Sequence, residues 1–293
     1  MRIRPRSLAM LLGLALLAAP SATSAAPAQP SVPACALGTS SADLKGFFAA
    51  ELARTERRFG KRPGKRLQFA TGAAAYVYGL APVAVSATTQ RFLENQLVSI
   101  AALTDPSVRT VVLPNHDTTY TVGTLQLAAG PRILDVPDTA GRYYVIQLLD
   151  AYSNTFAYVG RRTTGTRAGS YAIVAPGFNG GLPAGVKRIQ SPTNLVWVLG
   201  RTLLRDAADL PAVAQVMGGY KVTDLSAWSA GEPQGSLVFG AFPTLAAVEL
   251  PTGADFYAAL GEILSTDPAP ARDACALRAF ARAGIGPGKA PEG

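Results

Sequence analysis

The feature that most restricts the fold is a series of short apolar runs in the middle of the chain. Gly, Pro, Asn and Asp separate these runs, which occupy residues 108–113, 120–127, 131–136, 142–149, 155–160, 170–175, 186–190 and 194–200. Such close spacing favours antiparallel strand pairing in a sandwich or a curled sheet. Because helical patterns stand on both sides, the order helix, sheet, helix predicts an α+β fold rather than alternating βαβ units.

Helical periodicity predicts elements before and after the strands. Before them, three sets of residues each share a helical face: Leu44, Phe47, Phe48 and Leu52; Phe69, Ala73, Tyr76, Val77 and Leu80; and Leu93, Leu97, Ile100 and Ala101. After them, start and stop signals predict three helices. One begins at Asp209 and Pro211 and ends at Gly218 and Gly219; one, capped by Thr252 and Asp255, carries Phe256, Leu260, Ile263 and Leu264; the last begins at Asp267 and Pro268.

The N-terminus has the three parts of a secretory signal. Arginines precede an apolar run from Leu8 to Ala19, and small residues follow around Ser24 to Ala26. The run is shorter than the roughly 20 residues that span a bilayer core, and we expect no transmembrane segment after signal removal. We therefore predict a secreted protein, extracellular or periplasmic. We expect residues 1–25 to be the signal peptide, residues 26–66 to hold an N-terminal helix and a basic segment, and residues 67–293 to form a single α+β domain.

Basic residues are concentrated in one run. The whole chain carries a net charge of +8, and residues 54–66 hold seven basic residues against Glu56. Summed positive charge favours a polyanion or an anionic membrane surface, whereas a solvated helix end and loop is the alternative interpretation. No nucleic acid is expected as a partner, because no aromatic residue beyond Phe59 interleaves with the charges as base stacking requires.

The chain has two cysteines, Cys35 near the mature N-terminus and Cys275 near the end. In an oxidising compartment such a pair commonly forms a disulfide, which would join the two ends of the mature chain. The alternative is a lipid on Cys35, because the residues before it faintly resemble a lipoprotein cleavage box. That box lies well beyond the apolar run.

The familiar catalytic signatures are missing from the sequence. There is no Gly-rich phosphate loop after a strand, no G-x-S-x-G motif, and no pair of Cys or His at metal-ligand spacing. His116 is the one histidine, so any serine triad would have to use it as the base. Calcium could still bind through Asp117 and Asp150, although no loop has the regular acidic spacing of a dedicated site. We therefore expect neither a metal nor a cofactor.

Polar side chains nevertheless gather around the strand break "PNHDTTY" and along the run that follows residue 141. The candidate ligand-binding residues are Asn115, His116, Asp117, Thr118, Tyr120, Arg142, Tyr143, Gln147, Asn154 and Arg161. Strand periodicity places Tyr143, Val145 and Gln147 on one face and Tyr144, Ile146 and Leu148 on the core face. The first face could line a cleft for a sugar or another small polar ligand, or it could be ordinary sheet surface.

Several of these segments resemble a bacterial family, domain of unknown function 1254. The resemblance rests on "AYVYGLAP", on the N-x-D-T-x-Y motif at Asn115, Asp117, Thr118 and Tyr120, on the G-R-Y-Y strand and V-G-x-R-T-T-G turn after it, on "SPTNLVWVLGRTLL" and on "ARAGIGPG". It extends from about Leu67 to Gly288. Members of that family are often exported or envelope-associated, and many continue into a companion domain of unknown function 1214. The resemblance implies that a separate chain supplies this domain as a partner, or that the present chain is a shorter form.

His116 occupies a variable position of the family motif, so interest turns to Asn115 and Asp117. Both side chains can bond local backbone N–H groups and fix a tight connection between strands. Alternatively Asp117, held by Asn115 and Tyr120 and approached by Arg142 or Arg161, is a poised carboxylate. Two functions remain open. The first is a protein that binds a small-molecule or cell-envelope ligand, polar or carbohydrate-like, near the motif. The second is a secreted hydrolase with Asp117 as acid/base, Tyr120 as its polar partner and Arg161 as an anion clamp.

Overall fold

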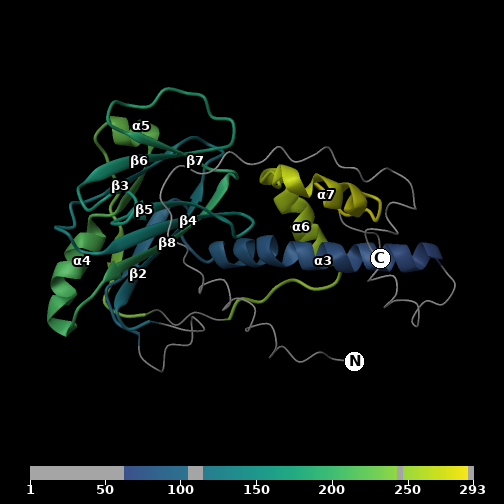
Figure 1. The fold of residues 1–293 in the computed structure, drawn as a ribbon, viewed down its shortest axis with the longest axis horizontal. Coiled ribbons are helices and arrows are strands. Elements are labelled where there is room, and N and C mark those ends of the chain that lie inside the picture. The colour runs from purple at the N-terminus through teal and green to yellow at the C-terminus, as the bar shows by residue number, and fades with distance from the viewer. Residues whose placement is uncertain (1–62, 105–114, 243–246, 290–293) are drawn as a thin grey trace.

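The computed structural model describes residues 63–104, 115–242 and 247–289 and has the predicted α+β architecture (Figure 1). Two packed sheets carry the short helices α4 (Leu210–Gly218) and α5 (Leu225–Ser229). A helical lobe made of α3 (Pro63–Thr89), α6 (Ala254–Thr266) and α7 (Ala274–Ala281) lies at one end of these sheets. The predicted helix at residues 44–52, the predicted strand at residues 108–113 and Cys35 lie outside the described residues.

The larger sheet has six strands in the order β10-β1-β2-β8-β4-β5. Their bounds are β1 Gln96–Ile100, β2 Thr118–Gln126, β4 Tyr144–Asp150, β5 Thr155–Gly160, β8 Leu195–Leu203 and β10 Leu237–Phe239. All neighbours in this sheet pair antiparallel except β1 and β10, which pair parallel.

The smaller sheet has four strands in the order β7-β6-β3-β9. Their bounds are β3 Arg132–Val136, β6 Gly169–Val174, β7 Lys187–Gln190 and β9 Lys221–Asp224. β6 and β7 pair parallel, and the other pairs are antiparallel. Single 3₁₀ turns at Ala207–Asp209 and Ala271–Asp273 lead into α4 and α7.

The main core fills the space between the two sheets. On β4, Tyr144, Ile146 and Leu148 are fully buried in it, while Val145 and Gln147 are only half-buried, which confirms the predicted alternation. The buried β4 side chains belong to one apolar cluster with side chains of the smaller sheet and of α4. The sheet pair is therefore a sandwich whose inner faces are apolar.

The helical lobe is built on close approach between α3 and α6. An added Cβ at Gly79 would lie 2.9 Å from side-chain atoms of both Leu260 and Phe256, so the absence of a side chain lets the two helices touch. Helix α3 was expected, and its predicted core face is right only in part. Leu80 packs in the cluster of the lobe and the Tyr76 ring lies 4.5 Å from that of Phe256, but Val77 remains 68% exposed. The side that packs on α6 and α7 also includes small residues, among them Ala70, Ala75 and Gly79, which allow close approach between the helices.

Helix α3 also corrects the expectation that no segment beyond the signal is long and apolar enough to span a bilayer. By length and composition, its 23-residue segment Leu67–Thr89 is long and apolar enough to cross a bilayer. Of the most apolar stretch of this segment, 39% is buried inside the protein. The core helix of a soluble protein passes the same test, so the segment does not by itself indicate a membrane span.

Three other expectations about helices differ from the structure. Leu97 and Ile100 were assigned to a helix, but they lie in β1, which pairs with β2. Helix α6 is preceded by Gly253, so Thr252 does not cap it. Asp267 lies at the end of α6 rather than at the start of α7, and its carboxylate accepts a hydrogen bond from the backbone N of Leu195 at 2.7 Å.

Candidate functional site

The polar break before β2 is a turn organised by Asn115. Its Oδ1 accepts hydrogen bonds from the backbone N of Thr118 at 2.8 Å, from Thr118 Oγ1 at 2.7 Å and from the backbone N of Asp117 at 3.3 Å. Its Nδ2 donates to the Tyr120 hydroxyl at 2.7 Å. The carboxamide therefore joins the turn to the first residues of β2, as Asn side chains do where strands are connected.

Tyr120 is the centre of a cluster on the outer face of the six-stranded sheet, the face directed away from the main core. The Arg201 guanidinium lies over the Tyr120 ring, 5.0 Å from its centroid, and Arg201 Nη1 is 3.5 Å from the Tyr120 hydroxyl. Phe242 packs edge-on against the same ring at 5.9 Å. We call Asn115, Thr118, Tyr120, Arg201 and Phe242 the Tyr120 cluster.

The strand register extends this cluster into a continuous surface. Tyr120 pairs with Arg201 and Arg201 with Val145, which places these side chains in one row across the outer face. The next row runs through five strands and contains Val98, Val122, Leu199, Gln147 and Tyr158. Tyr158 is 47% exposed, and the other four side chains are half-buried. The outer face thus combines apolar side chains with two tyrosines, an arginine and an amide.

The helical lobe covers only one end of this outer face. Leu195 and Trp197, at the beginning of β8, pack with the cluster formed by α3, α6 and α7. Arg201 lies further along β8, beside the turn that holds Asn115. The Tyr120 cluster is therefore at the end of the sheet away from the lobe.

His116 and Asp117 are both exposed. Within the described residues their side chains make no hydrogen bond or ion pair, and Asp117 contributes only its backbone groups to the turn. The expectation that the Asp117 side chain fixes this connection is wrong, because the Asn115 amide already satisfies the N–H groups that Asp117 was expected to bond.

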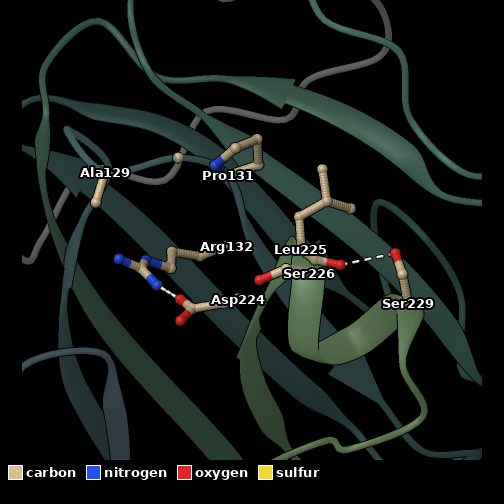
Figure 2. A pocket seen from close by; sticks show the side chains of 8 residues that line it. Ala129, Pro131, Arg132, Asp224, Leu225, Ser226 and Ser229 are labelled. Atoms are coloured by element: carbon tan, nitrogen blue, oxygen red, sulfur yellow. Dashed lines mark hydrogen bonds and ion pairs between the residues drawn. The ribbon is translucent and has the colours of Figure 1, made fainter.

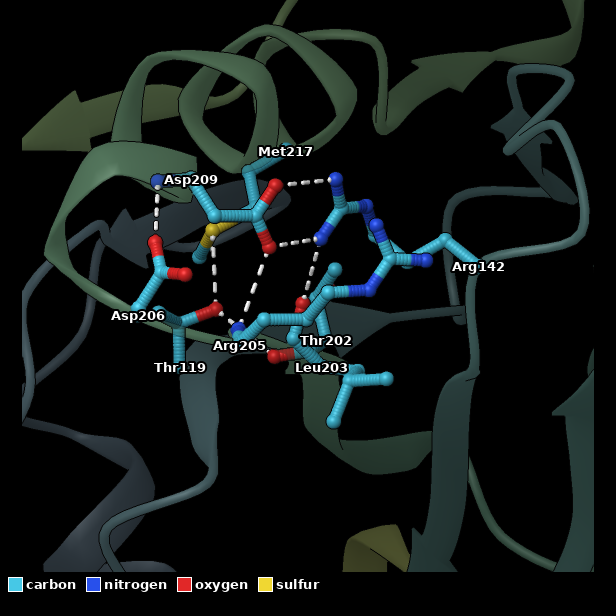
Figure 3. Close-up of polar contacts among 8 residues, drawn as sticks. All are labelled: Thr119, Arg142, Thr202, Leu203, Arg205, Asp206, Asp209 and Met217. Atoms are coloured by element: carbon cyan, nitrogen blue, oxygen red, sulfur yellow. Dashed lines mark hydrogen bonds and ion pairs between the residues drawn. The ribbon is translucent and has the colours of Figure 1, made fainter.

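Arg142 does not approach Asp117, because its guanidinium forms an ion pair with Asp209 (Figure 3). Its Nη1 and Nη2 donate to the two Asp209 oxygens at 2.5 Å and 2.6 Å, and Nη1 also donates to the carbonyl of Leu203 at 2.8 Å. The Arg142 guanidinium lowers the pKa of the Asp209 carboxyl to about 2. This bidentate pair joins the segment before β4 to the start of α4, so we assign it a structural role.

The remaining candidates are dispersed. Tyr143 lies beneath Arg162, whose guanidinium carbon is 5.7 Å from the ring centroid. Gln147 donates to Thr155 Oγ1 at 2.6 Å. Asn154 bonds the Asp150 carboxylate in the turn after β4, and Arg161 is exposed in the turn after β5. Of these, Gln147 lies within β4 on the outer face that carries Tyr120.

The two acidic residues considered for calcium are far apart in the register. Asp150 pairs with Val196 at the lobe end of β8, whereas Thr118, next to Asp117, pairs with Leu203 at the other end. Asp150 is also engaged, since its Oδ1 accepts from the backbone N of Tyr152 and of Asn154. Among the described residues, no group of three or more His, Cys, Asp or Glu could hold a metal ion.

A separate hollow of about 420 Å³ lies beside β3, β9 and α5 (Figure 2). Its charged residues are Arg132 and Asp224, which form an ion pair, and Arg132 Nε donates to the carbonyl of Gln126 at 3.0 Å. Burial lowers the pKa of the Arg132 guanidinium. Both charges already have partners, and their ion pair joins β3 to β9. We therefore regard the hollow as a by-product of this contact between the two strands.

Arg201 and Phe242 were not among the residues expected at the site. A signal for Arg201 was present in "VWVLGRTLL", where one charged residue continues the period-two pattern of Trp197 and Leu199. No pattern in the sequence indicated that Phe242 belongs to the site, because its ring reaches Tyr120 only in the folded chain, after β10.

Comparison with known proteins confirms the family resemblance over the central part of the chain. Residues 94–224 match the sequence model of the family described as Protein of unknown function (DUF1254). No curated protein matches the chain.

The fold is similar to that of the VPA0106 protein from Vibrio parahaemolyticus, known from a crystal structure. The two share 23% sequence identity with a TM-score of 0.59, over 77% of the present chain and 54% of the Vibrio chain. The present chain thus spans about half the length of that protein. An uncharacterized protein from Burkholderia cenocepacia aligns at 14% identity with a TM-score of 0.33, over 48% of this chain and 38% of that one.

Proposed function

We propose that this chain is an exported or envelope-associated binding protein and that its ligand lies on the outer face beside Tyr120. The ligand class is a small carbohydrate-like molecule with a carboxylate, such as a uronic acid. One observation carries this proposal: the Arg201 guanidinium stacks on the Tyr120 ring. Arg201 is half-buried, and among the described residues it has no carboxylate partner.

The outer face is suited to stacking against a ring. The solvent side of a sandwich sheet is usually polar, yet here Val98, Val122 and Leu199 form a half-buried apolar strip. The exposed ring of Tyr158 lies at one end of this strip, and Gln147 stands between that ring and Leu199. Binding sites commonly combine apolar and aromatic walls with a few placed polar groups.

Arg201 supplies the charge selectivity. The Tyr120 ring holds the guanidinium, and Asn115 donates to the Tyr120 hydroxyl, so the position of the ring is fixed from both sides. A guanidinium held on an aromatic ring keeps N–H donors in the geometry that a carboxylate accepts. An acidic sugar would place its carboxylate at Arg201 and its ring over the apolar strip.

The hydrolase alternative draws less support from the geometry. Asp117 is exposed, and Arg161, its expected anion clamp, lies in the turn after β5. Within the described residues no second carboxylate or nucleophile is hydrogen-bonded to Asp117. Binding requires none of this machinery.

Isothermal titration calorimetry with glucuronate and galacturonate oligomers, and with the matching neutral sugars, tests the proposal. We expect saturable binding of the acidic sugars only. Arg201→Ala should weaken it by about tenfold or more, because a charge-assisted hydrogen bond contributes roughly 1.5 to 3 kcal/mol. Arg167→Ala, which removes an exposed arginine elsewhere, is the matched control and should bind normally. Equal binding by the Arg201→Ala protein, or no binding of any acidic sugar, would refute the proposal.

A further inference from the structure

The stretch of chain from β5 to β8 carries only positive charge. From Ala151 to Arg205 the sequence has seven Lys and Arg residues and no Asp or Glu. This stretch includes β5 and β8, the two strands that lie beside β4 in the larger sheet. Positive charge that no acidic neighbour in the sequence balances favours an anionic ligand.

A second arginine is stacked on a tyrosine close to the Tyr120 cluster. The Arg162 guanidinium lies over the Tyr143 ring, 5.7 Å from its centroid, much as Arg201 lies over Tyr120. Within the described parts of the chain, neither guanidinium has a carboxylate partner. Arg142, the neighbour of Tyr143, is paired with an aspartate instead. The fold thus neutralises the arginine that joins two segments but not the two that are stacked on tyrosines.

The strand register places both stacks on the outer face. The backbone N of Arg161 donates to the carbonyl of Tyr144 at 3.1 Å, which continues the pairing of β4 with β5 beyond the end of β5. Tyr143 and Arg162 are therefore opposite each other. Tyr143 is two residues from Val145 on β4, so its side chain points to the same outer face.

The register also gives the separation of the two stacked arginines. Arg201 pairs with Val145 across one strand boundary, and Arg162 lies across the next boundary, two residues further along. Strands lie about 4.8 Å apart and advance about 3.3 Å per residue, so the two Cα atoms are about 12 Å apart. Each arginine leans over its tyrosine in the same direction, from β8 over β2 and from β5 over β4, which keeps the guanidinium groups apart.

This separation requires one anion for each guanidinium. At an ionic strength of about 0.15 M, charges are screened over about 8 Å, so a carboxylate at Arg201 leaves Arg162 largely unneutralised. A single sugar ring with one carboxylate is too short to meet both groups. Between them lie the half-buried side chains of Val145 and Tyr143, which offer apolar surface to further sugar rings.

We propose that Arg162 on Tyr143 is a second anion subsite of this surface and that the ligand is an acidic polysaccharide whose repeated carboxylates meet Arg201 and Arg162 together. The inference rests on the proposed function, because it extends the site at Arg201. The sugar chain crosses from β8 over β4 to β5, at the end of the sheet away from the lobe. Two contacts linked in one ligand reinforce each other, so an oligomer binds more tightly than a single uronate.

Isothermal titration calorimetry with galacturonate and its linear tetramer tests the need for two carboxylates. The tetramer should bind the unchanged protein about tenfold or more tightly than the monomer, because a charge-assisted contact contributes a factor of this size. Arg162→Ala should remove this advantage and leave binding of the monomer in place, whereas Arg201→Ala should weaken both. Arg162→Gln provides the same comparison if the alanine variant does not fold.

Two controls separate recognition of the carboxylates from general effects of charge and ring size. Arg167→Ala removes another exposed arginine from the chain that follows β5 and should bind the tetramer as the unchanged protein does. The methyl-esterified tetramer has the same rings without the negative charges, and it should not bind measurably.

Failure of this inference and failure of the proposed function give different results. A tetramer that binds no more tightly than the monomer overturns the second subsite, and so does an Arg162→Ala protein that binds the tetramer normally. In both cases a site for one carboxylate at Arg201 still stands. If no acidic sugar binds the unchanged protein, or if the methyl ester binds as well as the free acid, the proposed function and this inference are both overturned.

Discussion

Replacing Asn115 by alanine removes the carboxamide that organises the turn before β2. Three donors lose their acceptor: the backbone N of Asp117, and both the backbone N and the hydroxyl of Thr118. Thr118 is only 8% exposed, so water reaches its backbone N and hydroxyl poorly, whereas the backbone N of Asp117 is open to water. Unpaired groups of this kind cost roughly 1 to 3 kcal/mol, and we expect a loss of about 2 kcal/mol in the free energy of unfolding.

Thermal melting and urea unfolding of the purified protein measure this loss. For a chain of this size, about 2 kcal/mol corresponds to a fall in Tm of roughly 4 to 8 °C. Asn115→Asp keeps the acceptor oxygens, so it should lose less than half as much. His116→Ala and Asp117→Ala are the neighbouring controls, and each should stay within about 0.5 kcal/mol because both side chains are exposed.

Two outcomes would refute this reasoning. One is an Asn115→Ala protein that unfolds within about 0.5 kcal/mol of the unchanged protein. The other is an Asp117→Ala protein that loses as much stability as Asn115→Ala, because this would return the turn to the carboxylate. A gain of stability in Asp117→Ala would instead indicate that the carboxylate is held at a cost, as groups at working sites often are.

Four further substitutions test other parts of the structure. Gly261→Ala should lower the free energy of unfolding by roughly 1 to 3 kcal/mol, because the added Cβ would lie 2.5 Å from a backbone carbonyl oxygen of the C-terminal turn. Gly72→Ala should raise the free energy of unfolding by up to about 1 kcal/mol, because the added Cβ would meet only a hydroxyl at 3.6 Å. Urea unfolding of the two variants should therefore show changes of opposite sign in the free energy of unfolding. Asp209→Asn should lower Tm at pH 5 to 7, and the difference should shrink as the pH falls from about 4 to about 2. The reason is that Arg142 depresses the folded pKa of Asp209 to about 2, so its stabilisation is present above the unfolded pKa and is lost on protonation; a difference that does not change with pH would contradict this. Cys275→Ser should lower Tm in secreted protein under non-reducing conditions, and an unchanged melt would argue against the predicted disulfide.

The local sequence pattern was enough to predict an element and its buried face where the side chains alternate or repeat at regular spacing. The alternation through Tyr144, Ile146 and Leu148 identified the core face of β4, because successive side chains of any strand point to opposite faces. The start and stop residues of α4 were equally readable, since Pro and Gly act on their own backbone. The α+β order of elements followed from such local signals.

Tertiary contacts decided what those signals left open. Leu97 and Ile100 fit a helix by spacing, but five residues are too few to fix a period, and hydrogen bonds to β2 made them a strand. At the site, the sequence placed polar residues around Tyr120 but could not choose between Asn115 and Asp117 for the turn. It also could not select Arg201 over Arg142 and Arg161 as the arginine of the cluster. That choice depends on which strands become neighbours, and β2 and β8, separated by about seventy residues of chain, meet only because the folded sandwich buries the inner faces of both.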